Sequence, residues 1–245
     1  MNFFNSYEDA IRADAYSKLE FAGTYYLAYR DLPEIITTYV HGNKAIDFGC
    51  GTGRSTRFLQ KLGFSTIGID ISEKMIQIAK KTDPKGDYRL IKDGDFSQLA
   101  VHTYNLVLSA FTFDNIPTKE KKITFFSGLA SLLNQEGKIL NLVSSPDIYI
   151  HEWASFSTKD FPENICAKSG DIVPIITTDI LDKRPCYDIL WTDEDYKKVF
   201  TQARLKLVQT YKPLAKGIEP YKWINETKIA PWVIYVLKNK KHTLK

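Results

Sequence analysis

From residue 44 onward, short apolar runs alternate with stretches whose apolar residues recur at helical spacing. This alternation is typical of a parallel sheet whose strands are joined by helices that pack on its faces. The predicted strands are 45–48, 66–69, 88–91, 105–108 and 138–143. The pattern therefore predicts an α/β fold with a doubly wound, mostly parallel sheet.

Residues that commonly begin or end helices stand between these runs. Ser72, Thr118 and Thr192 each precede a helical pattern, where a hydroxyl oxygen can accept a hydrogen bond from a free backbone N–H group. Gly63 is placed to end the helix that follows the first strand. The connection between the predicted strands 88–91 and 105–108 is too short for a full helix. Two more strands are expected at 204–212 and 231–238.

The chain of 245 residues is long enough for one core with an insertion. We therefore expect a single domain in four parts. Residues 1–42 form a helical, aromatic N-terminal cover, and 43–143 form the core. Residues 144–191 are rich in aromatics, prolines and acids and form an inserted cap after the fifth strand. Residues 192–245 supply a C-terminal helix and the last two strands.

Composition excludes several classes of protein. The net charge of +4 is too small and too dispersed to predict a nucleic-acid partner. The three cysteines form no CxxC pair, which disfavours a zinc site or a disulfide framework. No run approaches the roughly 18 apolar residues of a membrane span. We expect a soluble, cytoplasmic protein without a bound metal.

The segment "IDFGCGTG" follows the first strand and opens a helix, the place where open α/β sheets bind ligands. A dinucleotide-binding loop would need glycine at position 54, which holds Arg54. Asp47 would repel a pyrophosphate but attract an ammonium group. The loop therefore predicts an amino-acid moiety, with its carboxylate at the helix start and its ammonium group toward Asp47.

Acids at the next two strand ends extend this prediction. Asp70 can accept hydrogen bonds from both ribose hydroxyls. Asp95 can accept from an adenine amino group, and Ile71, Met75 and Phe96 can sandwich the base. An amino acid at one end and a nucleoside at the other describe S-adenosylmethionine.

The order "IDFGCGTG", "IGIDIS", "DGDF" and "YNLVLSAFTFDNIP" resembles class I S-adenosylmethionine-dependent methyltransferases, especially small-molecule enzymes such as those of ubiquinone and menaquinone biosynthesis. The resemblance covers residues 44–143. It implies a seven-stranded sheet, whose last strand is antiparallel, and a methyl-transfer activity. Many relatives have a histidine pair where this chain has Asp114 and Asn115. The predicted cofactor-binding residues are Asp47, Gly49, Cys50, Gly51, Gly53, Asp70, Ile71, Met75, Asp95, Phe96, Ser109 and Ala110.

The N-terminal segment suggests a lid over the cofactor. Because a sulfonium is a cation that aromatic faces attract, we expect Tyr16, Phe21 and Tyr25 to help close the site. Core packing is the alternative role of these aromatic residues.

The acceptor pocket is expected under the insertion. His151 is the candidate general base because its pKa can lie near neutrality, and a half-buried packing histidine is the alternative. Other candidate substrate residues are Asp114, Glu152, Trp153 and Trp191. A small-molecule acceptor is favoured. A protein or RNA acceptor and a non-catalytic module that binds S-adenosylmethionine stay open, whereas Arg54 and Asp47 disfavour a nicotinamide dehydrogenase. The oligomeric state is left open.

Overall fold

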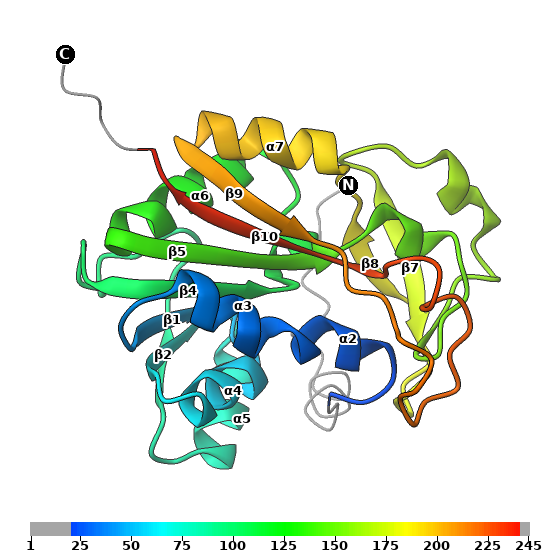
Figure 1. Ribbon diagram of the computed structural model, residues 1–245, viewed down its shortest axis with the longest axis horizontal. Helices are drawn as coiled ribbons and strands as arrows, with labels where there is room; N and C mark the ends of the chain where they lie inside the picture. Colours follow the sequence, from blue (N-terminus) through cyan, green and yellow to red (C-terminus); the bar gives the residue numbers. More distant parts are fainter. Residues whose placement is uncertain (1–20, 241–245) are drawn as a thin grey trace.

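A seven-stranded sheet forms the centre of the molecule in the computed structural model, which describes residues 21–240 (Figure 1). The strand order is β3-β2-β1-β4-β5-β10-β9. Strands β1 to β5 pair in parallel, and β10 runs antiparallel to both β5 and β9. The predicted fold is thus confirmed. The strands are β1 (Lys44–Phe48), β2 (Ser65–Asp70), β3 (Asp87–Leu90), β4 (Tyr104–Ala110), β5 (Leu133–Ser144), β9 (Leu205–Tyr211) and β10 (Trp232–Asn239).

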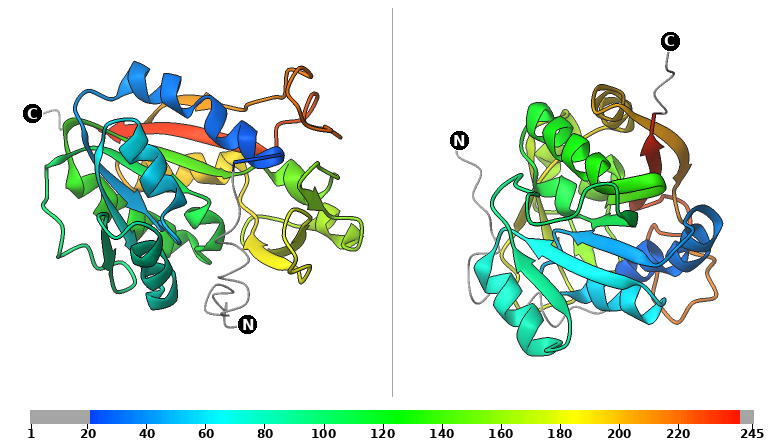
Figure 2. Two further views of the ribbon diagram at one scale, coloured as in Figure 1. Left: turned by 90° about the horizontal axis from the view of Figure 1, so that it is seen from below. Right: turned by 90° about the vertical axis from the view of Figure 1, so that its left-hand side faces the viewer.

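Helices cover both faces of the sheet (Figures 1 and 2). One face carries α3 (Leu32–Tyr39), α4 (Arg54–Lys61) and α5 (Glu73–Thr82), and the other carries α6 (Lys119–Leu132) and α7 (Asp193–Gln202). Alternate residues of the strands divide between the two cores. Leu140 and Leu142 of β5 join the core below α3, whereas Ile139 and Val143 join the core below α6 and α7.

The helix starts follow the predicted hydroxyl caps. The side-chain oxygen of Ser72 accepts from the backbone N–H of Met75 at 3.3 Å, and that of Thr118 accepts from Lys121 at 3.2 Å. Thr192 caps α7 in the same way. Gly63, at φ 90°, follows the end of α4. No helix lies between β3 and β4, as their short connection predicts.

The inserted segment has regular structure that its sequence does not reveal. Strands β6 (Phe156–Ser157), β7 (Ile172–Thr177) and β8 (Cys186–Ile189) form a small antiparallel sheet. The 3-10 helices η3 (Pro146–Tyr149) and η4 (Pro162–Cys166) precede β7. These strands were not predicted because they are short and are separated by long irregular loops. In Figure 1 the small sheet lies beside the carboxyl ends of the parallel strands.

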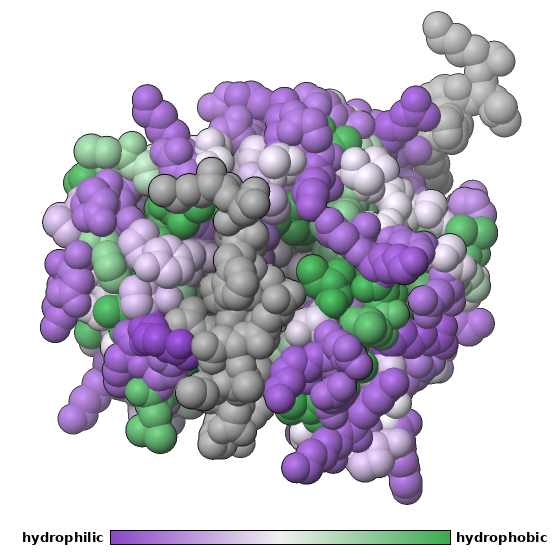
Figure 3. All heavy atoms as spheres, turned by 180° about the vertical axis from the view of Figure 1, so that it is seen from behind, coloured by the Kyte–Doolittle hydropathy of each residue, from purple (hydrophilic) through white to green (hydrophobic). Residues whose placement is uncertain are grey.

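The surface is mainly hydrophilic on the face shown in Figure 3, where the hydrophobic side chains gather in smaller patches. Within residues 21–240, no helix combines the length and the apolar character that crossing a membrane requires.

Candidate functional site

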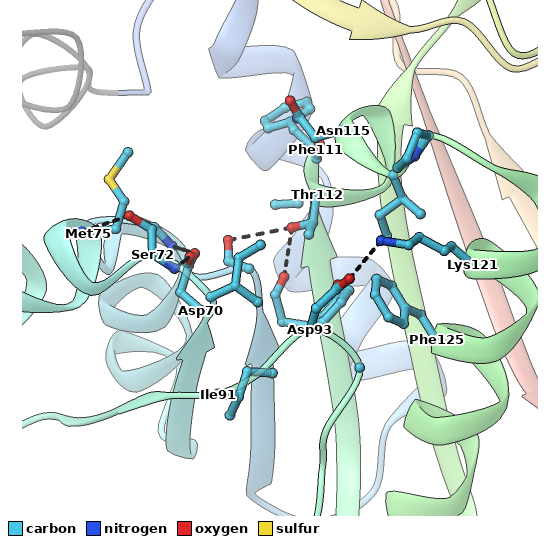
Figure 4. Close-up of a pocket in the computed structure, with 18 residues that line it drawn as sticks. Asp70, Ser72, Met75, Ile91, Asp93, Phe111, Thr112, Asn115, Lys121 and Phe125 are labelled. Carbon is cyan, nitrogen blue, oxygen red and sulfur yellow. Dashed lines mark hydrogen bonds and ion pairs between the residues drawn. The ribbon is translucent and has the colours of Figure 1, made fainter. Parts of the chain in front are cut away.

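A cavity of about 520 Å³ opens where the strand order reverses between β1 and β4. This switch point is the usual ligand crevice of doubly wound sheets. Figure 4 shows Asp70, Ser72 and Met75 on one side of the cavity and Lys121 and Phe125 on the other. The lining residues are Phe48, Gly49, Gly51, Asp70, Ile71, Ser72, Met75, Ile91, Asp93, Gly94, Ala110, Phe111, Thr112, Asn115, Ile116, Pro117, Lys121 and Phe125.

The glycine loop forms one wall of this cavity. Gly49 has φ 70°, and a Cβ there would lie 2.1 Å from Oγ1 of Thr112, so no larger residue fits. Gly51 has φ 53°, and a Cβ there would meet no atom within 4 Å. Because Gly51 lines the cavity, that open space is available to a ligand.

Asp70 connects the end of β2 to the glycine loop. Its Oδ2 accepts from the backbone N–H of Gly51 at 2.8 Å, and its Oδ1 accepts from that of Ser72 at 2.8 Å. Burial raises the pKa of this carboxyl, although the hydrogen bonds from Ser72 and Gly51 oppose the shift. Each oxygen has a second lone pair, so the carboxylate can still accept two hydroxyl groups of a ligand.

Asp47 lies beneath the loop and is fully buried. Its Oδ2 accepts from the hydroxyls of Ser55 at 2.7 Å and Thr56 at 2.6 Å. Oδ1 is buried without a hydrogen-bond partner among the described residues. Burial raises the pKa of Asp47 to about 6. The side chain does not line the cavity, so its role toward a ligand ammonium stays a prediction.

At the end of β3 the structure brings a different acid to the cavity from the one predicted. Asp93 and Gly94 line the cavity, whereas Asp95 is exposed and accepts from the backbone N–H of Ser97 at 2.9 Å. The turn at Gly94 (φ 77°) directs the chain away after Asp93. Phe96 also misses the cavity, because its ring packs edge-on against Phe48 with the centroids 5.9 Å apart.

Of the other predicted cofactor residues, Gly49, Gly51, Asp70, Ile71, Met75 and Ala110 line the cavity. Cys50, Gly53 and Ser109 do not. Cys50 is buried in a small core with Ile76 and Tyr88. Gly53 lies against the Tyr88 ring, and Ser109 is fully buried within β4.

The N-terminal aromatic side chains surround a cation of the protein itself. The guanidinium of Arg54 lies 5.3 Å from the ring centroid of Phe21 and 5.0 Å from that of Tyr25. Tyr29 is also near, at 5.7 Å. Phe21 does not line the cavity at the switch point, and Tyr16 lies outside the described residues. A lid role for these residues therefore stays a prediction.

A second cavity, of about 40 Å³, adjoins the first, since Phe111 and Asn115 line both. Asp114 of η2 (Thr112–Asn115) and Tyr25 of α2 (Thr24–Arg30) line it as well. Asp114 is thus the only one of the predicted acceptor residues on either cavity wall.

The structure does not bring the remaining acceptor candidates to these walls. The indole N–H of Trp153 donates to the carbonyl of Ile148 at 2.8 Å, which holds this buried ring in the core. Trp191 packs beside Tyr196 in the core below α7. Glu152 accepts from the hydroxyl of Thr158 at 3.2 Å. His151 is half-buried, edge-on to the Trp153 ring.

Several lining residues were not predicted from the sequence. Thr112 donates its hydroxyl to the carbonyl of Phe48 at 2.8 Å, which ties η2 to the end of β1. Lys121 forms an ion pair of 2.7 Å with Asp93 across the mouth of the large cavity (Figure 4). Asp93 stands in the same "KDGDF" segment as Asp95, and the direction of the turn between them decides which of the two lines the cavity. Asp188 comes from the inserted sheet, and no local pattern marks it.

Comparisons with known proteins agree with this architecture. Residues 45–137 match the family model described as "Methyltransferase domain". An uncharacterized methyltransferase of Alkaliphilus oremlandii is 36% identical over 98 residues, which are 39% of this chain and 43% of that protein. One from Bacillus cytotoxicus is 34% identical over 113 residues, covering 46% of this chain and 51% of that protein. The match spans about half the length of these relatives.

Solved structures extend the likeness of the fold over the whole chain. The CcbJ methyltransferase of Streptomyces caelestis superposes with a TM-score of 0.67 at 14% identity, over 97% of this chain and 99% of that one. An S-adenosylmethionine-dependent methyltransferase of Clostridium acetobutylicum gives 0.62 at 13% identity, over 96% of both chains. Residues 45–137 therefore match a methyltransferase domain, and the chain has the fold of S-adenosylmethionine-dependent methyltransferases.

Proposed function

We propose that the protein transfers a methyl group from S-adenosylmethionine to a small-molecule acceptor. The observation that carries this proposal is the pair of adjoining cavities at the carboxyl ends of the parallel strands. The larger has room for a nucleoside with an amino-acid tail, and the smaller lies where an acceptor group would meet it. The acceptor class follows the resemblance to ubiquinone and menaquinone methyltransferases.

The residues around the larger cavity fit S-adenosylmethionine. The open space at Gly51 lets ligand atoms approach the main chain, and Asp70 retains lone pairs for ribose hydroxyls. Ile71, Met75 and Ile91 offer apolar walls for the adenine ring. Asp47, with its unpartnered Oδ1, adds negative charge below the loop for an ammonium group.

In this proposal the cofactor supplies a methyl group that its positive sulfur already activates. The protein then contributes alignment of the acceptor with that methyl group and exclusion of water. The acceptor needs a general base only when it carries a proton at the working pH. The inserted sheet beside the smaller cavity supports an acceptor small enough to be enclosed, as opposed to a protein or RNA surface.

Isothermal titration calorimetry with S-adenosylmethionine and with NAD tests the cofactor assignment. Methyl-labelled S-adenosylmethionine, incubated with a metabolite extract and separately with protein and RNA fractions, tests the acceptor. We expect label in the small-molecule fraction. Label only in the protein or RNA fraction would show that the acceptor is a macromolecule. Binding of S-adenosylmethionine without label in any fraction would favour a non-catalytic module.

A further inference from the structure

The smaller cavity lies between the two sheets of the molecule. One face of the inserted sheet forms one side, through the cross-strand pairs Phe156–Thr177 and Ile175–Cys186. Asp188 follows Cys186 by two residues on β8 and therefore points to the same face. Trp232 and Ser144, paired across β10 and β5, line the opposite side.

Four aromatic rings line this cavity, those of Tyr25, Phe111, Phe156 and Trp232. Their neighbouring centroids are 4.8 to 5.8 Å apart. Aromatic faces attract cations, as the Arg54 guanidinium 5.0 Å from the Tyr25 ring centroid illustrates, although Arg54 itself does not line this cavity. The rings therefore favour a positively charged ligand group over a neutral one.

Phe111 separates the smaller cavity from the larger one, and its backbone is strained. It has φ 65°, a left-handed conformation that costs a residue other than glycine about 1 kcal/mol or more. Strain of this kind persists at functional sites, where the surrounding structure enforces it. Here the surrounding structure holds the Phe111 ring between the larger and the smaller cavity.

Two carboxylates from different elements also line the cavity. Oδ2 of Asp114 accepts from the backbone N–H of Ser144 at 3.0 Å, and Oδ2 of Asp188 accepts from the Tyr149 hydroxyl at 3.1 Å. Burial raises the pKa of Asp188 to about 8, and the charge of Asp114 adds to the shift. A ligand cation between them would relieve this repulsion.

Two cations of the protein lie near the cavity, the Arg54 guanidinium beside Tyr25 and the Lys122 ammonium, and neither lines it. Lys122 is fully buried in α6, and its ammonium donates to the Phe113 carbonyl. It lies 5.0 Å from the centroid of the Trp191 ring, in the core below α7, and it does not line the cavity. One buried ammonium therefore faces two carboxylates, which leaves a net negative charge when all three groups are ionised.

We infer that the smaller cavity is the acceptor subsite and takes an amine, with its protonated head between the Asp114 and Asp188 carboxylates and the four aromatic rings. This inference rests on the proposed methyl transfer. The ammonium gives one proton to the Asp188 carboxylate. The freed nitrogen lone pair then forms the N–C bond while the C–S bond breaks, its electron pair staying on sulfur. The products are a methylated ammonium ion and a neutral thioether, and Asp188 later returns its proton to water.

The test compares two probes of nearly equal shape, n-propylammonium and 1-propanol. Saturation-transfer NMR at pH 9, where the Asp188 carboxyl is ionised and n-propylammonium still carries its charge, measures their binding to the wild-type protein saturated with S-adenosylhomocysteine. We expect the ammonium to bind about tenfold or more tightly than the alcohol. Equal binding of the two probes, or binding of neither, would overturn the amine assignment. A wild-type protein that does not bind S-adenosylhomocysteine at all would instead contradict the proposed function.

Variants locate the subsite. Asp188→Asn and Asp114→Asn keep the side-chain shape and should each weaken n-propylammonium binding about tenfold. Their affinity for S-adenosylhomocysteine, measured by calorimetry, should stay within about twofold of wild type. Asp160→Asn, on the exposed surface of the inserted segment, is the matched control. Unchanged ammonium binding in folded Asp188→Asn and Asp114→Asn proteins would place the amine elsewhere and refute the inference.

Discussion

The backbone N–H of Gly51 donates to the Asp70 carboxylate at 2.8 Å, so the glycine loop and the end of β2 form one structural unit. The carboxylate also accepts from Ser72, at the start of α5. A ligand that binds Asp70 is therefore presented to the loop in a fixed position.

Replacing Asp70 with asparagine should weaken S-adenosylhomocysteine binding at least tenfold. A charged acceptor contributes about 1.5–3 kcal/mol to a hydrogen bond, and the new amide would face one of the two backbone N–H donors. Calorimetry measures the affinity. Asp87→Asn, on the exposed edge strand beside Arg89, is the control and should bind as wild type does. Wild-type affinity in a folded Asp70→Asn protein would remove Asp70 from the cofactor site.

Gly51→Ala tests whether the open space at this glycine belongs to the cofactor. The new methyl group would enter space that is free of protein atoms and would compete with a ligand. The positive φ should also cost about 1–2 kcal/mol of stability. We expect cofactor affinity to fall at least tenfold in calorimetric titrations.

Gly217→Ala separates the two effects of the Gly51 substitution. Gly217 has φ 78° and an equally open Cβ direction, but it lies outside both cavities. This variant should lose a similar stability in urea unfolding and keep the wild-type affinity. Equal affinities of the Gly51→Ala and Gly217→Ala proteins would argue against a ligand at Gly51.

The buried Asp47 carboxyl should make stability depend on pH. Its pKa is about 6 in the folded protein against 3.8 as the ordinary value, so the folded state binds the proton more tightly than the unfolded state. The stabilising contribution of the protonated Asp47 carboxyl to folding is therefore fully present below about pH 4 and is lost as pH rises through 6. The loss is about 3 kcal/mol when complete.

Asp47→Asn removes this titration, and its amide oxygen can still accept from Ser55 and Thr56. The stability of the variant relative to wild type should rise by about 2–3 kcal/mol between pH 4 and pH 7. Urea unfolding of both proteins at each pH measures the difference, which cancels groups common to both. A difference that does not change with pH would show that burial leaves the Asp47 carboxyl unperturbed.

The parallel core was predictable because local patterns determine it. Each apolar run of the core became a strand, and Ser72 and Thr118 begin helices where their hydroxyls suggest. Gly49, Gly51 and Asp70 reach the cavity because their places follow from the end of a strand, where the direction of the chain is fixed. These features depend on neighbours in sequence, which a single chain reveals.

The smaller cavity was less predictable because it depends on contacts between distant segments. Asp114 and Asp188 are 74 positions apart in the sequence and share a cavity only because β8 of the inserted sheet packs beside η2. His151 and Trp153 stand in the most polar aromatic stretch, yet neither lines the larger or the smaller cavity. Asp93 lines the larger cavity and Asp95 does not, because the chain turns at Gly94. Composition does not indicate the direction of that turn.

Glu226 provides the last prediction, since it connects its own loop to α2 and to the inserted segment. This fully buried carboxylate accepts through Oε1 from the Thr24 hydroxyl and the Ala154 N–H, each at 2.7 Å. Oε2 accepts from the backbone N–H groups of Ile224 at 2.8 Å and Asn225 at 3.1 Å. In Glu226→Gln, the amide nitrogen would face two donors, which should cost about 2–4 kcal/mol of folding free energy.

Urea unfolding measures that cost, and Glu163→Gln, an exposed change in η4, should alter stability by less than about 0.5 kcal/mol. A double-mutant cycle with Thr24→Val then isolates one connection. Because the Thr24 hydroxyl has the Glu226 carboxylate as its acceptor, the two substitutions should be non-additive by about 1 kcal/mol or more. Limited proteolysis should cleave the inserted segment of Glu226→Gln faster than that of wild type. Additive effects and unchanged cleavage would mean that Glu226 stabilises its own loop without holding α2 and the inserted segment together.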